Sequence, residues 1–133
     1  MPISIHDCSG FDVAQLKSKI KDTKRAVFIK FSVEGCAPCK YLKDDINRYK
    51  TDFNQSRKDL NVDIFEINGT FSSTCPFFNS MCADFQISAF PTIVMVDQNM
   101  KPIGNDTGRI IGSKIEKLKE LISSNSEMFK ATA

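Results

Sequence analysis

Several kinds of residue and pattern are scarce in this sequence. It has no tryptophan and one histidine, and its formal net charge is +2. A charge this small does not indicate nucleic acid or an anionic membrane as a partner, and no apolar run approaches the ~20 residues that span a bilayer. His6 alone suggests no metal-ligand set. Phenylalanine and the aliphatic residues must therefore build the core.

Length and composition indicate one domain. The chain has 133 residues, of which 41% are hydrophobic and 26% charged, as in an ordinary globular protein. We expect a single domain over residues 1–133, a monomer or weak dimer, with a polar tail that frays after about Ser123.

The N-terminus and the composition bear on location. The first seven residues lack the basic start and long apolar stretch of a signal peptide, so we expect a cytoplasmic protein. The many Lys, Ile, Asn and Phe residues suggest an AT-rich genome, such as that of a protist or a large DNA virus. A virion or an oxidising compartment is therefore the alternative location.

Strand and helix patterns alternate along the chain. The apolar run at 26–31 is typical of a strand buried on both faces, and Leu42, Ile46, Tyr49 and Phe53 share one face of the helix that follows. The other expected elements are a strand at 3–5, a helix from Ser9, a strand at 62–67, a helix capped by Thr74 with Pro76 in its first turn, strands at 92–96 and 109–111, and a last helix opened by a capping box at 113–116. This order predicts an α/β fold: a central mixed sheet, mostly parallel, with helices on both faces. Its last two strands, joined by a short turn, form an antiparallel edge.

Five cysteines carry the strongest functional signal. Four form two close pairs, Cys36/Cys39 and Cys75/Cys82, and Cys8 is left over as a small core or boundary residue. Cytosolic proteins normally keep their thiols reduced, so a close pair there indicates redox or metal chemistry.

The first pair has the spacing that thiol–disulfide exchange needs. Cys36 directly precedes a helix, where free backbone N–H groups stabilise a thiolate, and Cys39 lies one turn further on the same face. Pro38 fits the first turn and stiffens the Ala37–Pro38 loop. A zinc half-site and two unrelated core cysteines are the alternatives.

Three segments resemble the thioredoxin family: 31–40, 89–92 and 108–112. The resemblance covers nearly the whole chain and implies a thioredoxin fold in which Pro91 is cis and faces the dithiol. It also implies that the backbone of Phe90 pairs with substrate. The implied activity is exchange with protein disulfides, without cofactor or metal, with a reductase or oxidase as electron partner.

The chain departs from the family pattern at three positions. Gly35 stands where the family usually has Trp, which removes a flat contact surface, and Ala37 replaces a usual Gly. Lys30 stands where the family has the carboxylate that helps take a proton from the second cysteine. A cation there would stabilise thiolates, unless Lys30 reaches solvent or pairs with an acid such as Glu66.

The second pair leaves alternatives open. Cys75 and Cys82 would lie about 10 Å apart if both were helical, too far for a disulfide, so a bond requires Cys75 to fold back from a loop. Catalytic domains of the protein disulfide isomerase group carry a similarly spaced pair, and this resemblance favours a structural disulfide or secondary redox pair. Free thiols, or a zinc site made with the first pair, are the alternatives.

The leading function is therefore a thiol–disulfide oxidoreductase that attacks with Cys36 and resolves with Cys39. A non-catalytic scaffold or binding module of the same fold is the alternative, since Trp and the buried carboxylate are missing.

Overall fold

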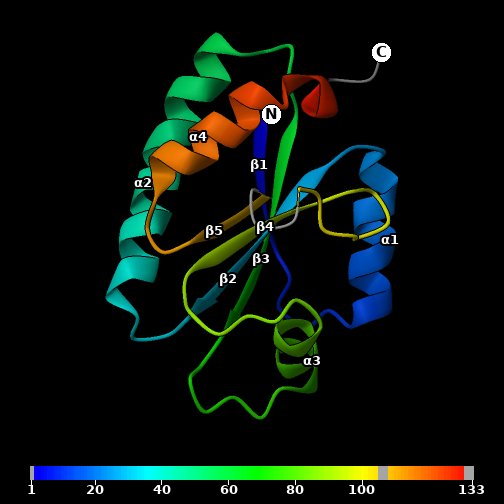
Figure 1. The fold of residues 1–133 in the computed structure, drawn as a ribbon, viewed down its shortest axis with the longest axis vertical. Helices are drawn as coiled ribbons and strands as arrows, with labels where there is room; N and C mark the ends of the chain where they lie inside the picture. The colour runs from blue at the N-terminus through cyan, green and yellow to red at the C-terminus, as the bar shows by residue number, and fades with distance from the viewer. Residues whose placement is uncertain (1, 105–107, 131–133) are drawn as a thin grey trace.

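A five-stranded sheet covered by helices on both faces makes up the protein (Figure 1). The computed structural model describes residues 2–104 and 108–130. In chain order the elements are β1 (Ile3–Asp7), α1 (Val13–Thr23), β2 (Val27–Val33), α2 (Ala37–Ser56), β3 (Val62–Gly69), α3 (Pro76–Asp84), β4 (Thr92–Val96), β5 (Arg109–Ile111), α4 (Ile115–Ser124) and the 3-10 helix η2 (Ser126–Phe129). Within these ranges, no helix has both the length and the apolar character needed to cross a membrane.

The strands run in the order β1-β3-β2-β4-β5. β1 and β2 pair with β3 in parallel, whereas β4 is antiparallel to both β2 and β5. The predicted mixed sheet is confirmed. Its antiparallel pairing is not limited to the last two strands, because β4 also pairs antiparallel with the central strand β2. The short turn expected between β4 and β5 is wrong, because residues 97–108 separate them and Pro102 forms a bridge back to Val96.

Each face of the sheet has its own helices and its own core. α2, α4 and η2 cover one face, and α1 and α3 cover the other, as Figure 1 shows. All seven residues of β2 are buried, as its apolar run predicts. Side chains alternate along β2, so Phe28 packs under α2 while Ile29 and Phe31 pack on the α1 and α3 side. Lys30 therefore points toward the face that α2 covers.

The start of α1 differs from the prediction. Asp12, rather than Ser9, caps it, because the Asp12 carboxylate accepts from the Gln15 N–H at 2.8 Å and the Gln15 side chain accepts from the Asp12 N–H at 2.9 Å. The helix consequently begins at Val13, and Leu16 and Ile20 are its buried residues.

Two other predicted helix caps are also wrong. Lys114 occupies the cap position of α4 and makes no side-chain cap hydrogen bond, so the capping box expected at 113–116 does not form. Cys75 rather than Thr74 occupies that position in α3, and Pro76 lies in the first turn as predicted.

The C-terminal segment packs against the core through Phe129, so the fraying predicted after Ser123 is wrong for residues 124–130, and residues 131–133 lie outside the described residues. α4 continues to Ser124, and η2 begins two residues later at Ser126. The Phe129 side chain is fully buried, with its ring centroid 5.3 Å from that of Phe28. The Phe129 carbonyl accepts from the Asn61 N–H at 2.6 Å, which fastens the segment to the chain just before β3.

Candidate active site

Cys36 caps the N-terminus of α2. Gly35, after the end of β2, has a φ of 76°, a left-handed conformation that glycine adopts without steric cost and that turns the chain from strand to helix. Cys36 then has extended backbone angles, and its Sγ accepts from the Cys39 N–H at 3.2 Å. Pro38 lies in the first turn. The amide and the helix dipole both favour negative charge on the Cys36 sulfur.

Cys36 and Cys39 form a disulfide. Their Cα atoms are 5.3 Å apart. Cys39 is buried, with 6% of its surface exposed, whereas Cys36 is half-buried. Cys36 therefore carries the sulfur that an incoming molecule can reach, and Cys39 lies behind it. Within residues 2–104 and 108–130, no group of three or more His, Cys, Asp and Glu side chains is arranged to hold a metal ion.

The loop before β4 lies against this disulfide. The Phe90–Pro91 peptide bond is cis, as the resemblance implies, and the Phe90 carbonyl oxygen lies 3.6 Å from Cys36 Sγ. The Thr92 hydroxyl donates to the Ala89 carbonyl at 2.8 Å. The structure thus brings Phe90 and Pro91 to the cysteine pair, although they are far away in sequence.

Lys30 is paired with Glu66. Lys30 Nζ lies 2.8 Å from Glu66 Oε2, and the two side chains are 3% and 15% exposed. They sit opposite each other on β2 and β3, on the face under α2. Of the alternatives for Lys30, the ion pair with an acid is therefore the one that forms.

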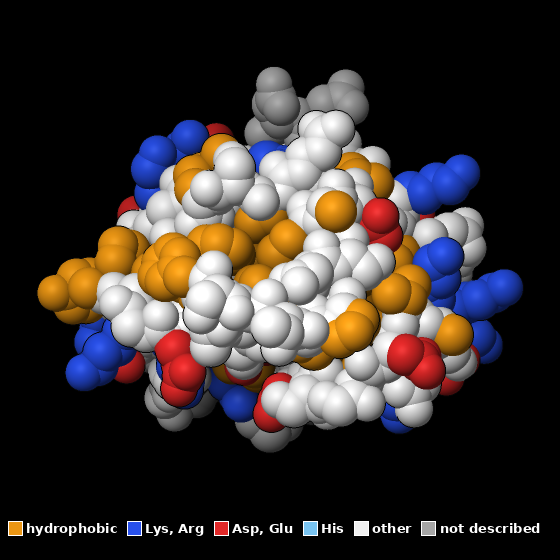
Figure 2. Space-filling model, turned by 90° about the horizontal axis from the view of Figure 1, so that it is seen from below, with side chains coloured by type: hydrophobic (Ala, Val, Ile, Leu, Met, Phe, Trp, Pro, Cys, Tyr) orange, Lys and Arg blue, Asp and Glu red, His pale blue; other side chains and the backbone are white. Residues whose placement is uncertain are grey.

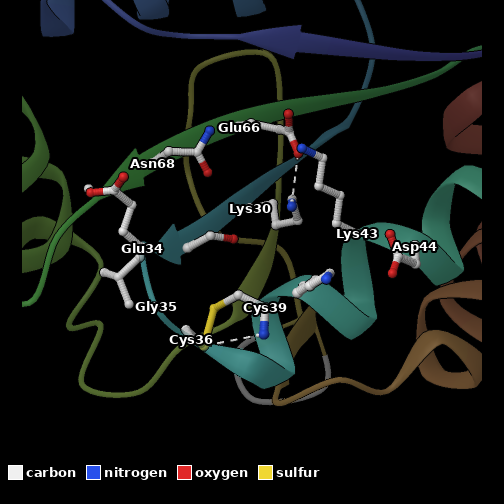
Figure 3. A pocket seen from close by; sticks show the side chains of 13 residues that line it. Lys30, Glu34, Gly35, Cys36, Cys39, Lys43, Asp44, Glu66 and Asn68 are labelled. Atoms are coloured by element: carbon white, nitrogen blue, oxygen red, sulfur yellow. Dashed lines mark hydrogen bonds and ion pairs between the residues drawn. A yellow bond between two sulfur atoms is a disulfide. The ribbon is translucent and has the colours of Figure 1, made fainter.

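This ion pair lines a pocket that also reaches Cys39. The pocket has a volume of about 470 Å³, and Lys30 lies between Cys39 and Glu66 in Figure 3. Ser32 lines it too, and its buried hydroxyl has no hydrogen-bond partner among the described residues. A polar, partly open space therefore connects Cys39 with the Glu66 carboxylate.

The other three cysteines are free thiols. The predicted Cys75–Cys82 bond is wrong because Cys75 occupies the cap position of α3 instead of folding back, and the two are separated along the helix. Burial raises the pKa of Cys82. Burial, with the negative charges of Asp7 and Glu66, raises the pKa of Cys8 to about 12.

An aromatic group beside Phe90 was missed by the sequence reasoning. The rings of Phe71 and Phe78 each lie 6.0 Å from the Phe90 ring. The available signal was a phenylalanine in the otherwise polar loop at 70–75.

Comparisons with known proteins agree with this geometry. The family model described as Thioredoxin matches residues 9–124. Thioredoxin H2 of Arabidopsis thaliana is 24% identical over 106 residues, which cover 80% of this chain and 67% of that protein. The structure of thioredoxin NaTrxh from Nicotiana alata superposes with a TM-score of 0.66 at 19% identity, over 93% of this chain and 94% of that one. Fasciola hepatica thioredoxin superposes with a TM-score of 0.64 at 18% identity, over 90% and 97% of the two chains.

Proposed function

The chain belongs to the thioredoxin family, and from this premise we propose that it reduces disulfide bonds in other proteins, in a reducing compartment such as the cytoplasm. The observation that carries the proposal is the Cys36–Cys39 pair at the start of α2, with the more accessible sulfur beside the Phe90–Pro91 loop. The Ala37–Pro38 dipeptide and the free Cys75 and Cys82 thiols favour a reductant over an oxidising isomerase. A separate reductase returns the protein to its dithiol form.

Cys36 makes the first attack. In the dithiol form its thiolate, stabilised by the Cys39 N–H and the helix dipole, attacks one sulfur of a substrate disulfide. The substrate S–S bond breaks, a mixed disulfide with Cys36 forms, and the other substrate sulfur leaves as a thiolate that takes a proton from water. The backbone of Phe90 lies beside this sulfur and is available to pair with the substrate backbone.

Cys39 then resolves the mixed disulfide. Its sulfur attacks Cys36 Sγ, the substrate leaves as its second thiol, and the Cys36–Cys39 disulfide forms. The substrate has gained two electrons and two protons, and the protein dithiol has lost them. Because both cysteines are held on one helix turn, this step is intramolecular and fast relative to attack by an external thiol.

Glu66 takes the proton that Cys39 loses in this step. It is the carboxylate that Lys30 holds in the pocket that Cys39 also lines, and a water molecule entering this pocket would relay the proton between the two groups. The Lys30 ammonium favours the thiolate of Cys39 in the same step. The carboxylate that the family has at position 30 is thus supplied here by the adjacent strand.

Reduction of insulin by the protein and dithiothreitol tests the proposal. The Cys36→Ser variant should fall to the background rate of dithiothreitol alone, whereas Cys39→Ser should accumulate a mixed disulfide that mass spectrometry detects. Cys75→Ser is the matched control, because it removes an exposed thiol and should retain full activity. Equal rates for Cys36→Ser and the unaltered protein would support the non-catalytic scaffold instead.

A further inference from the structure

A stack of aromatic rings supports an exposed phenylalanine, and one ring of this stack belongs to Phe90, whose carbonyl lies beside Cys36. Gly69 ends β3, and a Cβ atom there would lie 2.5 Å from the Phe78 ring, so glycine is what lets this ring lie against the strand. The Phe78 ring stacks on that of Phe90, 6.0 Å away at 24°. The Phe71 ring meets Phe90 edge-on, 6.0 Å away at 85°.

Phe71 contacts one aromatic ring of the protein but remains largely exposed to solvent. Its side chain is 74% exposed, although it contacts Phe90. Burying a phenylalanine side chain contributes about 1.5–3 kcal/mol of free energy. Phe71 gains little of this stabilisation within the chain, because most of its surface stays in contact with solvent. Exposed apolar surface of this kind is typical of interaction sites. In Figure 2, which views the end where α3 and the 70–75 loop lie, hydrophobic side chains spread over the middle of the face and charged ones surround it.

The position of Phe71 connects it to the reacting sulfur. Phe90, which Phe71 contacts, has its carbonyl oxygen 3.6 Å from Cys36 Sγ. On the loop that enters α2, Gly35 offers no side chain for a substrate to contact. Apart from the exposed Ala37 and Pro38 that follow Cys36, the apolar surface that the described contacts link to this cysteine comes from Phe90 and, through it, Phe71.

We propose that Phe71, supported by Phe90, selects substrates in which an apolar, preferably aromatic, side chain lies next to the reacting cysteine in an extended segment. This inference rests on the proposed function and names its substrate class. Such a side chain stacks on the exposed Phe71 ring while the neighbouring backbone runs along Phe90, and the substrate sulfur then meets Cys36.

Charge distribution favours this occupant over a charged one. The pocket under α2 is lined by Glu34, Lys40, Lys43 and Asp44, so charged groups gather on that side of the dithiol. Phe90 instead packs with the core on the α1 and α3 side, and the contacts described for Phe71 are aromatic. An apolar side chain that docks on Phe71 avoids desolvating the charged groups of the α2 side.

Two matched peptides test the proposal. Each carries one cysteine in a disulfide with a small thiol, flanked by Phe in one peptide and by Ser in the other, and stopped-flow measurements give their rates with the reduced protein. Phe71→Ser should lower the rate with the Phe-flanked peptide about three- to tenfold and change the other rate less than twofold. Phe71→Tyr should keep the preference. Met128→Ser, which removes an exposed apolar side chain from η2, is the control and should change neither rate.

Hydroxyethyl disulfide separates this inference from the proposed function. It has no flanking side chain, so its rate reports the dithiol alone and should be the same in all these variants. Loss of preference in Phe71→Ser with unchanged hydroxyethyl disulfide reduction supports the inference. An unchanged preference, or equal losses with both peptides, overturns it.

If the unaltered protein reduces none of the three compounds, the proposed function fails. A cysteine-free Phe peptide that still perturbs the Phe71 NMR signals would then support the binding surface, and unperturbed signals would overturn it.

Discussion

Lys30 and Glu66 form a largely buried ion pair between adjacent strands, with Lys30 Nζ 2.8 Å from Glu66 Oε2. The pair lies in the pocket that contacts Cys39, so a cation and a carboxylate both stand behind the resolving cysteine. In the proposed mechanism the carboxylate accepts a proton from Cys39, whereas the cation balances the charge of that carboxylate. Substituting each residue alone separates the two roles.

Glu66→Gln should slow resolution without slowing the first attack. General-base assistance contributes about 10²–10⁴-fold, and water can replace part of it here, so we expect on the order of a tenfold to hundredfold slower second step. Reaction of the reduced protein with an aromatic disulfide that releases a coloured thiolate separates the two steps by stopped flow. Resolution in Glu66→Gln should also become steeper with pH. A second step with unchanged rate and pH profile would remove Glu66 from the mechanism.

Lys30→Met should destabilise the fold. It leaves the largely buried Glu66 carboxylate without its partner, and because Glu66 lines a partly open pocket we expect a cost of about 1–3 kcal/mol. Urea unfolding measures the loss. The double variant Lys30→Met/Glu66→Leu should recover most of it, because both charges are then gone. Failure of the double variant to recover stability would mean that the cost comes from packing rather than from the unpaired charge.

Asp63→Asn should destabilise the protein at neutral pH and destabilise it less in acid. Burial alone would raise the pKa of Asp63, but hydrogen bonds and charges from His6 and Arg25 outweigh it and hold this pKa below the ordinary 3.8. The stabilisation is present above the unfolded pKa and is lost as pH falls through the lower folded one.

Urea unfolding near neutral pH and at about pH 3 measures this dependence. We expect a loss of about 2 kcal/mol near neutrality and a smaller one in acid. The control is Asp59→Asn, which removes an exposed ion pair with Arg57 and should cause no measurable change. An effect of Asp63→Asn that is equal at both pH values would contradict the assignment.

Thiol labelling should distinguish the three free cysteines. The thiolate is the reactive form, and the pKa of Cys8 is raised to about 12 by burial and by Asp7 and Glu66, so its thiol should resist alkylation until the protein unfolds. Cys75 is exposed and should be alkylated first. Cys82, whose pKa is raised by burial, should react more slowly than Cys75. Peptide mass spectrometry after timed iodoacetamide treatment gives the order, and early labelling of Cys8 would contradict its burial.

Phe129→Ala should be among the more destabilising single substitutions, because it removes a fully buried ring that stacks on Phe28. The expected cost is about 3–5 kcal/mol by urea unfolding. Met128→Ala, one residue earlier and 42% exposed, should stay within about 0.5 kcal/mol of the unaltered protein. Similar small effects of both substitutions would mean that η2 contributes little to the fold.

Local patterns explain which parts of the site could be predicted. The cysteine spacing, the apolar run of β2 and the segment around Pro91 each carry their information within about ten residues, and the structure brings them together. The environment of the Lys30 side chain could be predicted in part, because a lysine in a buried strand must reach either solvent or an acidic partner. Glu66 is the acidic partner that the sequence suggests, and it is the one that pairs with Lys30.

The remaining features depend on contacts between distant segments. The burial of Phe129 depends on Phe28, which a polar tail does not reveal. A bond between Cys75 and Cys82 needed the chain to fold back before α3, but Cys75 instead occupies the cap position of this helix and both thiols are free. The position of Phe71 near the active site follows from its ring contact with Phe90. Because α3 separates these two residues in the chain, the sequence does not reveal this contact.

The segment that Phe129 anchors has a practical consequence. Figure 1 shows η2 beside α4 at the end of the molecule opposite the loop that connects β3 to α3. A fluorophore, affinity label or solid support attached near Lys130 would leave the dithiol face free for large protein partners. A version shortened at Ser124 for the same purpose would be the wrong choice, since it would expose the apolar surface around Phe28 and invite aggregation.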